Sequence, residues 1–214
     1  MRTIALSFAL LSLTSCIISS PAKGPVEERT ITTTEEITGI AVSGGVDVII
    51  DDAIPYGQMR IFTNSDIFEY IEVEVIDNTL NLGMKPCNIS TQTLEVRMPA
   101  YNLNSISASG GSDVEWSGCV AESLTIAASG GANVDINGQC QQLIVAASGG
   151  ADIDLEELIS EDVSVAASGG ADIHVHASKS LIVQASGGAD VEYSGNPITK
   201  DINTSGGADV HADN

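Results

Sequence analysis

The chain has 214 residues, of which 29 are acidic and 8 are basic, so its formal charge is −21. This acidic excess argues against binding to nucleic acid or to an anionic membrane surface, and it makes cations the natural counterpart. A hydrophobic content of 43% and the regular spacing of Val, Ile and Leu argue against a disordered chain.

The N-terminus has the pattern of an export signal. Arg2 precedes an apolar run from Ile4 to Leu13, which is too short to span a bilayer. The run ends in the tetrapeptide LTSC, which resembles the lipobox of bacterial lipoproteins, where a peptidase cuts before the cysteine that carries the lipid. We therefore expect residues 1–15 to be a signal peptide and Cys16 to be the lipidation site. An ordinary secretory signal with an incidental cysteine is the alternative.

A lipid anchor would define where the protein resides. Two or more acyl chains suffice for stable anchoring, at ~0.8 kcal/mol per buried methylene. We expect the protein to be exported and lipid-anchored to the outer membrane, on its periplasmic face or at the cell surface. Residues 16–29, which include Pro21, Gly24 and Pro25, are expected to be the lipidated cysteine and a flexible tether.

Residues 30–214 are long enough for one sizeable domain and hardly for two. Residues 39–50, GIAVSGGVDVII, are interpreted as an outlying turn because they contain the Ser-Gly-Gly that recurs later in the chain. Between Gln58 and Ala100 the segments QMRIFT, YIEVEVI, TLNLGM and TLEVRM predict longer strands joined by polar turns. These strands would cap or flank the repeats.

From about residue 101 the chain is repetitive. The nonapeptide VAASGGADI occurs at 145–153 and again at 165–173. The Ser-Gly-Gly serines stand at 109, 129, 148, 168, 186 and 205, with intervals of 20, 19, 20, 18 and 19 residues. A period near twenty is typical of a solenoid, in which each turn buries its apolar face only by stacking on its neighbours. The glycines mark a bend, and Ser117-Gly118, Asn137-Gly138 and Ser194-Gly195 mark a second one.

Aligning the repeats on the serine gives apolar columns three residues before it and five and seven residues after it. The period-two alternation and the β-branched residues indicate strands whose apolar side chains face the interior. The sequence therefore predicts an all-β protein, a right-handed parallel β-helix or β-solenoid with turns of about 19–20 residues, flanked N-terminally by longer strands. The predicted interior columns are Ile106, Ile126, Val145, Val165, Val183 and Ile202; Val114, Val134, Ile153, Ile173, Val191 and Val210; and Trp116, Ile136, Leu155, Val175, Tyr193 and Ala212.

Two polar columns, four and six residues after the serine, alternate with the apolar ones and should face solvent. Stacked carboxylates ~4.8 Å apart repel by about 0.9 kcal/mol in bulk water. Calcium (Ca²⁺), which prefers oxygen ligands, could bridge them, although a merely solubilising acidic face is the alternative. The candidate cation-binding residues are Asp113, Asp135, Asp152, Asp154, Asp172, Asp190, Glu192 and Asp209.

The cysteines and histidines offer weaker signals. Cys119 and Cys140 lie about one repeat apart and are a candidate disulfide, with two buried thiols as the alternative; Cys87 would then be unpaired. His174 and His176 are two apart on one strand, which permits a transition-metal pair, although a solvated pair is the more ordinary interpretation. The sequence gives no firm metal site.

At this point the sequence resembles a known family, the head GIN domain of putative autotransporter adhesins, which is common in lipoproteins of Bacteroidetes. The resemblance covers roughly Thr30 to the C-terminus. The resemblance implies a β-helical fold and a role as an adhesin, and it implies no catalytic residues. The segments that carry it are ITGIAVSGGVDVII, YIEVEVIDNTLNLGM, LEVRMPAYNLNSISASGGSDVEWSG and GADVEYSGNP. The segment Ile17–Ser20 lacks the acidic cluster that resembles a surface-export signal in these lipoproteins, which favours the periplasmic face.

We therefore expect a non-catalytic envelope or surface module, an adhesin or ligand-binding β-solenoid that binds a protein or a glycan along an acidic face. A purely structural envelope lipoprotein is the first alternative. A polysaccharide-acting β-helix enzyme is the second. A lyase of that fold needs a basic side chain near its acidic cleft, and after Tyr101 the chain offers only Lys179 and Lys200 besides histidines. A Ser-Gly-Gly serine is equally poor as a nucleophile, because it recurs in every turn.

Overall fold

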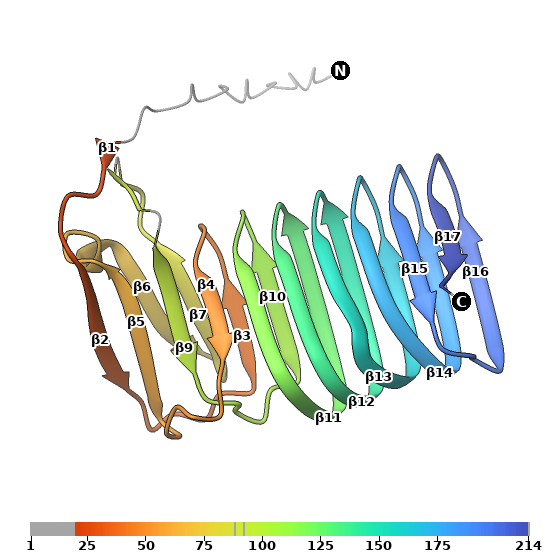
Figure 1. Cartoon of the computed structure of the whole chain (residues 1–214), viewed down its shortest axis with the longest axis horizontal. Coiled ribbons are helices and arrows are strands. Elements are labelled where there is room, and N and C mark those ends of the chain that lie inside the picture. Colours follow the sequence, from red (N-terminus) through yellow and green to blue (C-terminus); the bar gives the residue numbers. More distant parts are fainter. Residues whose placement is uncertain (1–19, 88, 92, 214) are drawn as a thin grey trace, which may run out of the picture.

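The computed structural model describes residues 20–87, 89–91 and 93–213. These residues form strands and one short 3₁₀ helix, and the strands stack into an elongated β-solenoid (Figure 1). No helix in the described ranges is long and apolar enough to cross a membrane. The predicted signal peptide and Cys16 lie outside the described residues.

The repeats build the regular turns that the sequence predicts. Strands of successive turns pair in parallel, with serine beside serine, as Ser129 lies beside Ser148. The all-β parallel solenoid with turns of about twenty residues is therefore confirmed. The strands are β10 (Ser105–Ser109), β11 (Asp113–Gly130), β12 (Asn133–Gly149), β13 (Asp152–Ala167), β14 (Asp172–Ala185), β15 (Asp190–Ser194), β16 (Thr199–Thr204) and β17 (Asp209–Ala212).

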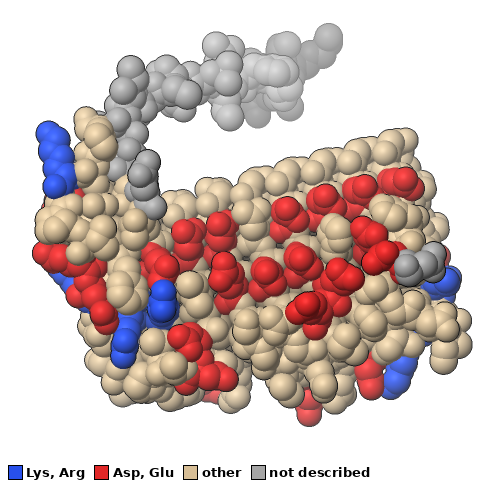
Figure 2. Space-filling view, viewed as in Figure 1, with Lys and Arg blue, Asp and Glu red and all other residues tan. Residues whose placement is uncertain are grey.

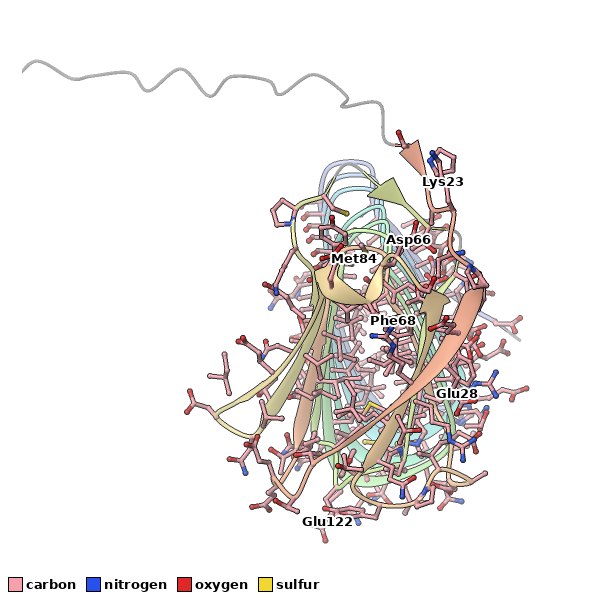
Figure 3. All side chains as sticks on the ribbon, turned by 90° about the vertical axis from the view of Figure 1, so that its left-hand side faces the viewer. Lys23, Glu28, Asp66, Phe68, Met84 and Glu122 are labelled. Atoms are coloured by element: carbon pink, nitrogen blue, oxygen red, sulfur yellow. The ribbon has the colours of Figure 1, made fainter. Side chains whose placement is uncertain are left out.

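Each turn contributes to two layers. The first layer contains the residues that follow a Ser-Gly-Gly, such as 152–155 of β13, and the second contains those that precede the next one, such as 163–167. Viewed along the solenoid, the two layers face each other with side chains between them (Figure 3). The predicted apolar columns fill this space, and Ile153 and Ile173 are fully buried. Burying one such side chain stabilises the fold by about 1.5–3 kcal/mol.

The Ser-Gly-Gly corner repeats because of backbone geometry. Gly169 has φ of 78°, a left-handed conformation that favours glycine. A Cβ atom at this position would lie only 2.9 Å from the main-chain N and O of Gly149 in the previous turn. Close stacking of the corners therefore requires glycine at the first position of each Gly-Gly pair.

The segment 39–50 is part of the stack. Its strands β3 (Gly39–Val42) and β4 (Asp47–Ile50) pair in parallel with β10 and β11. One turn further out, β7 (Thr79–Met84) and β9 (Leu94–Met98) pair in parallel with β3 and β4. The predicted outlying turn thus lies directly beside the repeats, and the strands predicted after it extend the same two layers.

Antiparallel strands close the N-terminal end. β6 (Ile71–Ile76) pairs with β7, β5 (Gln58–Asn64) pairs with β9, and the 3₁₀ helix η1 (Phe68–Tyr70) lies between β5 and β6 in the chain. Phe68 lies between the two layers at this end (Figure 3), with the guanidinium carbon of Arg29 3.8 Å from its ring centre. The predicted flanking strands are therefore confirmed.

The strand β2 (Val26–Thr32) pairs antiparallel with β5 along its whole length, and Ile31 packs on the core. Residues 26–29, which we had assigned to the tether, therefore belong to the sheet, because their main-chain groups complete the ladder of β5. Before them, β1 (Ser20–Pro21) pairs in parallel with β8 (Ile89–Ser90).

The last turn departs from the predicted interior. Ile202 is 37% exposed, Ala212 is exposed and Val210 is half-buried. In the described part of the chain, β16 and β17 pair only with the preceding turn, through β14 and β15. Their inward positions are therefore covered on one side only, and assigning Ile202 and Ala212 to the buried core was wrong.

Candidate functional site

The outward surface of the first layer, here called the acidic face, contains every predicted cation-binding residue. The two polar columns run along it as two rows of carboxylates, visible in red in Figure 2. Asp152, Asp172, Asp190 and Asp209 lie on consecutive strands in exact register. The acidic face comprises Asp47, Asp113, Glu115, Asp135, Asp152, Asp154, Asp172, Asp190, Glu192 and Asp209.

Two carboxylates of these columns, Asp135 and Asp47, have a raised pKa. Partial burial raises the pKa of Asp135, and repulsion from Asp154 and Glu157 raises it further. The pKa of Asp47 is likewise raised, by burial first and then by Asp113. An approaching cation would relieve this repulsion.

An asparagine and two histidines interrupt the columns and lie beside the neighbouring acids. Asn133 Nδ2 donates a hydrogen bond of 2.8 Å to Asp113 Oδ1. His174 lies with its ring nitrogens 3.5 Å from Asp172 Oδ1 and 3.5 Å from Glu192 Oε2. His211 lies 3.4 Å from Asp190 and 3.7 Å from Glu192. The C-terminal half of the acidic face is therefore a mixed ladder of histidines and carboxylates.

The columns do not form a chelating centre. Within the described ranges, no group of three or more His, Cys, Asp or Glu side chains is arranged to hold a metal ion. His176 Nδ1 lies 3.0 Å from Ser194 Oγ, whereas His174 contacts acids. Neighbouring turns place carboxylates in rows, as with Asp152 and Asp172.

The structure brings Cys119 and Cys140 into the same core but does not join them. Both are buried free thiols, so the predicted disulfide is wrong and its alternative holds. Cys119 aligns with Gly138 and Cys140 with Ala121, which sets the cysteines two residues out of register. Such diagonal neighbours are about 7–8 Å apart, beyond the usual Cα separation for a disulfide. Burial raises the pKa of Cys119 to about 12, which keeps the thiol protonated and unreactive.

One acidic residue in line with the columns was missed by sequence reasoning. Glu95 of β9 lies beside Asp47 and extends the first column by one turn. It forms an ion pair with Arg97 in the adjacent column. The residue four positions before Glu95 is Thr91 and not the serine of a Ser-Gly-Gly, so alignment on that motif could not find Glu95. The alternation in LEVRM was the available signal.

The two lysines of the repeats lie away from the acidic face. Lys179 Nζ pairs with Glu161 near the second bend. Lys200 belongs to β16 in the second layer, with its Nζ 5.5 Å from the ring centre of Tyr193. Neither lysine contacts a carboxylate of the acidic face in these pairs.

The family model and two of the similar solved structures are described as putative adhesins. The family model described as putative auto-transporter adhesin, head GIN domain, matches residues 36–197. A search of curated proteins gave no match.

Solved structures with the same fold include proteins from Bacteroides and Parabacteroides species. A protein described as a putative adhesin from Bacteroides fragilis superposes with a TM-score of 0.72 at 19% identity, covering 90% of this chain and 99% of that one. A putative adhesin from Parabacteroides merdae superposes with a TM-score of 0.52 at 15% identity, covering 92% of this chain and 99% of that one. A protein described as a putative lipid binding protein from Parabacteroides distasonis superposes with a TM-score of 0.52 at 16% identity, covering 91% of this chain and 99% of that one. At these identities the likeness shows the fold.

Proposed function

We propose that this chain, which belongs to the head GIN domain family of putative auto-transporter adhesins, is a lipid-anchored, non-catalytic envelope module that binds its partner along the acidic face. The observation that carries the proposal is the alignment of carboxylates on one layer of the solenoid, with Asp152, Asp172, Asp190 and Asp209 on consecutive strands. A rigid row of like charges with one period along its length suits an extended, repetitive partner.

The anchor follows from the lipobox-like LTSC and Cys16. A Cys16→Ser chain, expressed in a Gram-negative host, is expected to leave the membrane fraction and to lose incorporation of labelled fatty acid. Retention of both signals by the variant would refute the lipid anchor. Protease treatment of intact cells would then distinguish the cell surface from the periplasmic face.

Calcium is the proposed bridge between the acidic face and a protein or glycan. Two carboxylates from adjacent turns can supply part of the six to eight oxygen ligands that calcium takes, and water can supply the rest. With so few protein ligands we expect weak binding, in the range of roughly 10⁻⁴–10⁻³ M that extracellular modules show. Such binding would neutralise repelling pairs such as Asp152 and Asp172.

Calcium titration followed by thermal unfolding tests this. The melting temperature should rise with millimolar calcium in the unaltered chain, because an ion that binds only the folded state stabilises it. The rise should shrink in Asp172→Asn, which removes the middle of a column, and persist in Glu122→Gln, an exposed acid at the second bend. No calcium-dependent rise in the unaltered chain would favour inert surface charge and a purely structural role. Release of sugar products from a glycan panel would instead overturn the non-catalytic assignment.

A further inference from the structure

The C-terminal end of the solenoid, here called the open end and formed by β16 and β17, leaves part of the core uncovered. These strands pair only with the preceding turn in the described part of the chain (Figure 1). Ile202 is 37% exposed, although its partner in the preceding turn, Val183, is fully buried. Val210 is half-buried, whereas its partner Val191 is fully buried. Terminal turns of solenoids ordinarily present a polar outer surface, so two uncovered inward aliphatic side chains point to a partner.

The open end also presents main-chain groups that no strand pairs with in the described residues. The N–H groups of Ser205 and Asp209 donate to the preceding turn, both at 3.0 Å. Because the main-chain groups of successive strand residues point to opposite edges, those of Ile202 and Val210 lie on the outer edges of β16 and β17. Val210 N–H donates to the carboxylate of the neighbouring Asp209 at 2.9 Å, a bond that a carbonyl of an added strand could replace. Such edges are templates for another strand.

We propose that the open end pairs with the open end of a second copy of this chain, with β16 of each copy antiparallel to β17 of the other. The two-fold axis runs along the strands, between the layers. β16 and β17 run in opposite directions because the chain turns at Gly206, and Ile202 and Val210 each lie four residues from that corner. The axis therefore sets Ile202 of each copy opposite Val210 of the other. Their main-chain groups can then exchange both hydrogen bonds, and the two cores join.

The outward side chains match in this register. Asn203 of each copy lies opposite Asp209 of the other, and Asp201 lies opposite His211. The first pair repeats the asparagine–aspartate hydrogen bond of 2.8 Å that occurs on the acidic face. The second repeats the histidine–aspartate contacts of 3.4 and 3.5 Å found there. No carboxylate lies directly opposite another carboxylate across either ladder.

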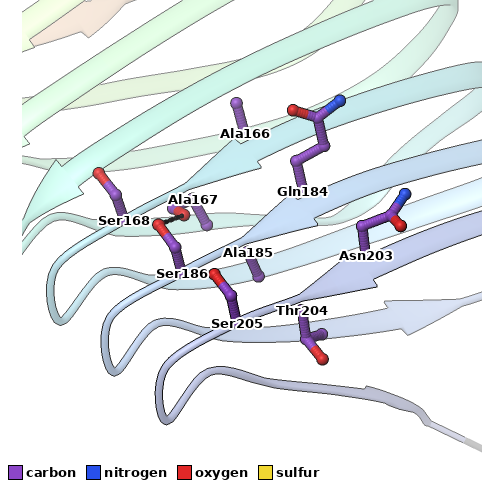
Figure 4. Close-up of a pocket in the computed structure, with 9 residues that line it drawn as sticks. All are labelled: Ala166, Ala167, Ser168, Gln184, Ala185, Ser186, Asn203, Thr204 and Ser205. Carbon is purple, nitrogen blue, oxygen red and sulfur yellow. Dashed lines mark hydrogen bonds between the residues drawn. The ribbon is translucent and has the colours of Figure 1, made fainter.

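Charge favours this pairing over two other ways to cover the open end. Pairing β17 with β17 would run the carboxylate rows of the two copies into each other. The proposed pairing instead sets β17 beside β16, where Asn203 stands next to the uncharged Gln184 of β14 (Figure 4). Head-to-tail stacking would bring the last turn against the N-terminal strand β6, which carries Glu72 and Glu74. A contact between like ends is closed, so it stops at two copies.

The contact is small, and its size sets its expected strength. Each end spans two layers ~10 Å apart and about five residues per strand at ~3.3 Å, so roughly 800 Å² is buried over both copies once outward side chains are counted. This lies below the roughly 1,200 Å² of stable specific interfaces, although two main-chain ladders add their hydrogen bonds. We therefore expect a reversible dimer with a dissociation constant of about 10⁻⁴ M. Lys200 lies at the end of a ladder, opposite Ala212, from where its ammonium group reaches solvent.

Sedimentation equilibrium of the full chain without calcium, at roughly 10–500 µM, tests the proposal. The average mass should rise toward two chains. Asn203→Asp should weaken dimerisation at least about tenfold, because each new carboxylate lies opposite Asp209 of the other copy. Asn102→Asp makes the same chemical change at an exposed position between β9 and β10 and should leave dimerisation unchanged. Circular dichroism and the melting temperature report whether each variant folds.

A charge swap separates a lost contact from a damaged fold. Adding Asp209→Asn to Asn203→Asp restores an amide–carboxylate pair at the same place and should recover the dimerisation of the unaltered chain. If Asp201→Asn recovers it instead, like strands pair with like, and the proposed arrangement is wrong. A chain that stays monomeric at the highest concentration would overturn the proposal, as would an unchanged dimer in folded Asn203→Asp.

Amide hydrogen exchange reports the main-chain pairing directly. The amides of Ile202 and Val210 should exchange more slowly as the concentration rises, because they become hydrogen-bonded across the contact. The amide of Asp209, which already donates to the preceding turn, should change less. Protection that requires an added extended peptide, in a chain that stays monomeric, would assign the edge to a foreign strand and refute the dimer. All these measurements are made without calcium, so their failure would leave the proposed function standing.

Discussion

The two layers of the solenoid are built by the same turns, yet their outward surfaces differ in how many charges they carry. In both layers the inward columns are aliphatic, as in Ile153 of the first layer and Val165 of the second. Outward, the first layer presents rows of carboxylates (Figure 2), whereas the second layer, from β7 to β14, presents uncharged side chains apart from Asp162 of β13. Because both layers share one core and one glycine corner, the fold does not require this difference. The inward columns therefore determine the structure, and the outward columns are where a function can be specified.

The largest expected effect on the free energy of unfolding comes from replacing isoleucine with alanine at an inward position, compared with the same replacement at an outward position. Ile153→Ala, at a fully buried site, should lower the free energy of unfolding by about 2–5 kcal/mol through lost burial and a cavity. Ile144→Ala, at a site 48% exposed on the outward side of the second layer, should change it by no more than about 0.5 kcal/mol. Urea unfolding of both variants measures this. Equal losses would show that inward and outward columns are not distinct.

Much of this fold could be predicted from the sequence, because aligning the repeats shows which positions are apolar in every turn. Columns such as Val134, Ile153 and Ile173 are inward in every interior turn for the same reason, namely the alternation of a strand. The same alignment placed the acids of the first layer on the acidic face. The alignment fails at Ile202 for a physical reason. It assumes that every turn has a neighbouring turn on both sides, whereas the last described turn has a neighbouring turn on one side.

Other features depend on register and on distant pairing, which periodicity does not encode. The second bend shifts the pairing between β11 and β12, so Cys119 and Cys140 miss each other although their spacing matches one repeat. The pairing of β3 with both β7 and β10 joins segments far apart in the chain, and only coordinates reveal it.

The second expected effect tests the corner that both layers share. Gly169→Ala forces an L-residue into a left-handed conformation and sets its Cβ 2.9 Å from the main chain of Gly149, so stability should fall by roughly 1–3 kcal/mol. In Gly170→Ala the added Cβ would meet only Gly149 O at 3.6 Å, an ordinary contact. The matched control should therefore be close to neutral. Thermal unfolding distinguishes them, and a tolerant Gly169 would mean that the corners stack less closely.

A smaller effect of opposite sign is expected on the acidic face. Burial and the repulsion of Asp154 and Glu157 raise the pKa of Asp135, so its charged form opposes folding. Asp135→Asn should therefore stabilise the chain at pH 7, by roughly 0.2–1 kcal/mol at low salt and less once salt screens the charges. Because the raised pKa penalises folding only above the unfolded value, the gain should vanish below about pH 4. A gain that persists in acid would mean that repulsion is not its cause.

The smallest expected effect involves an acid outside the columns, and its pH dependence is the reverse. Main-chain N–H groups of Lys23 and Gly24 donate to Asp66 at 2.9 and 3.2 Å, and the hydrogen bond from Lys23 is the main cause of its lowered pKa. A lowered pKa stabilises the fold above the unfolded value of about 3.9 and loses that effect as the pH falls through the folded one. Asp66→Asn should thus slightly lower the melting temperature at pH 7 and have no effect near pH 2.

Melting curves of Asp66→Asn and Asp135→Asn, recorded side by side from pH 7 down to pH 2, would make this contrast quantitative. The difference from the unaltered chain should have opposite signs at pH 7 in the two variants and should converge to zero in acid for both. If both variants were stabilised at pH 7, net charge alone would govern stability, since each removes one negative charge from the chain. Stability would then not depend on whether a carboxylate lies in a column of acids or beside main-chain N–H groups. The acidic face would not differ energetically from the rest of the surface.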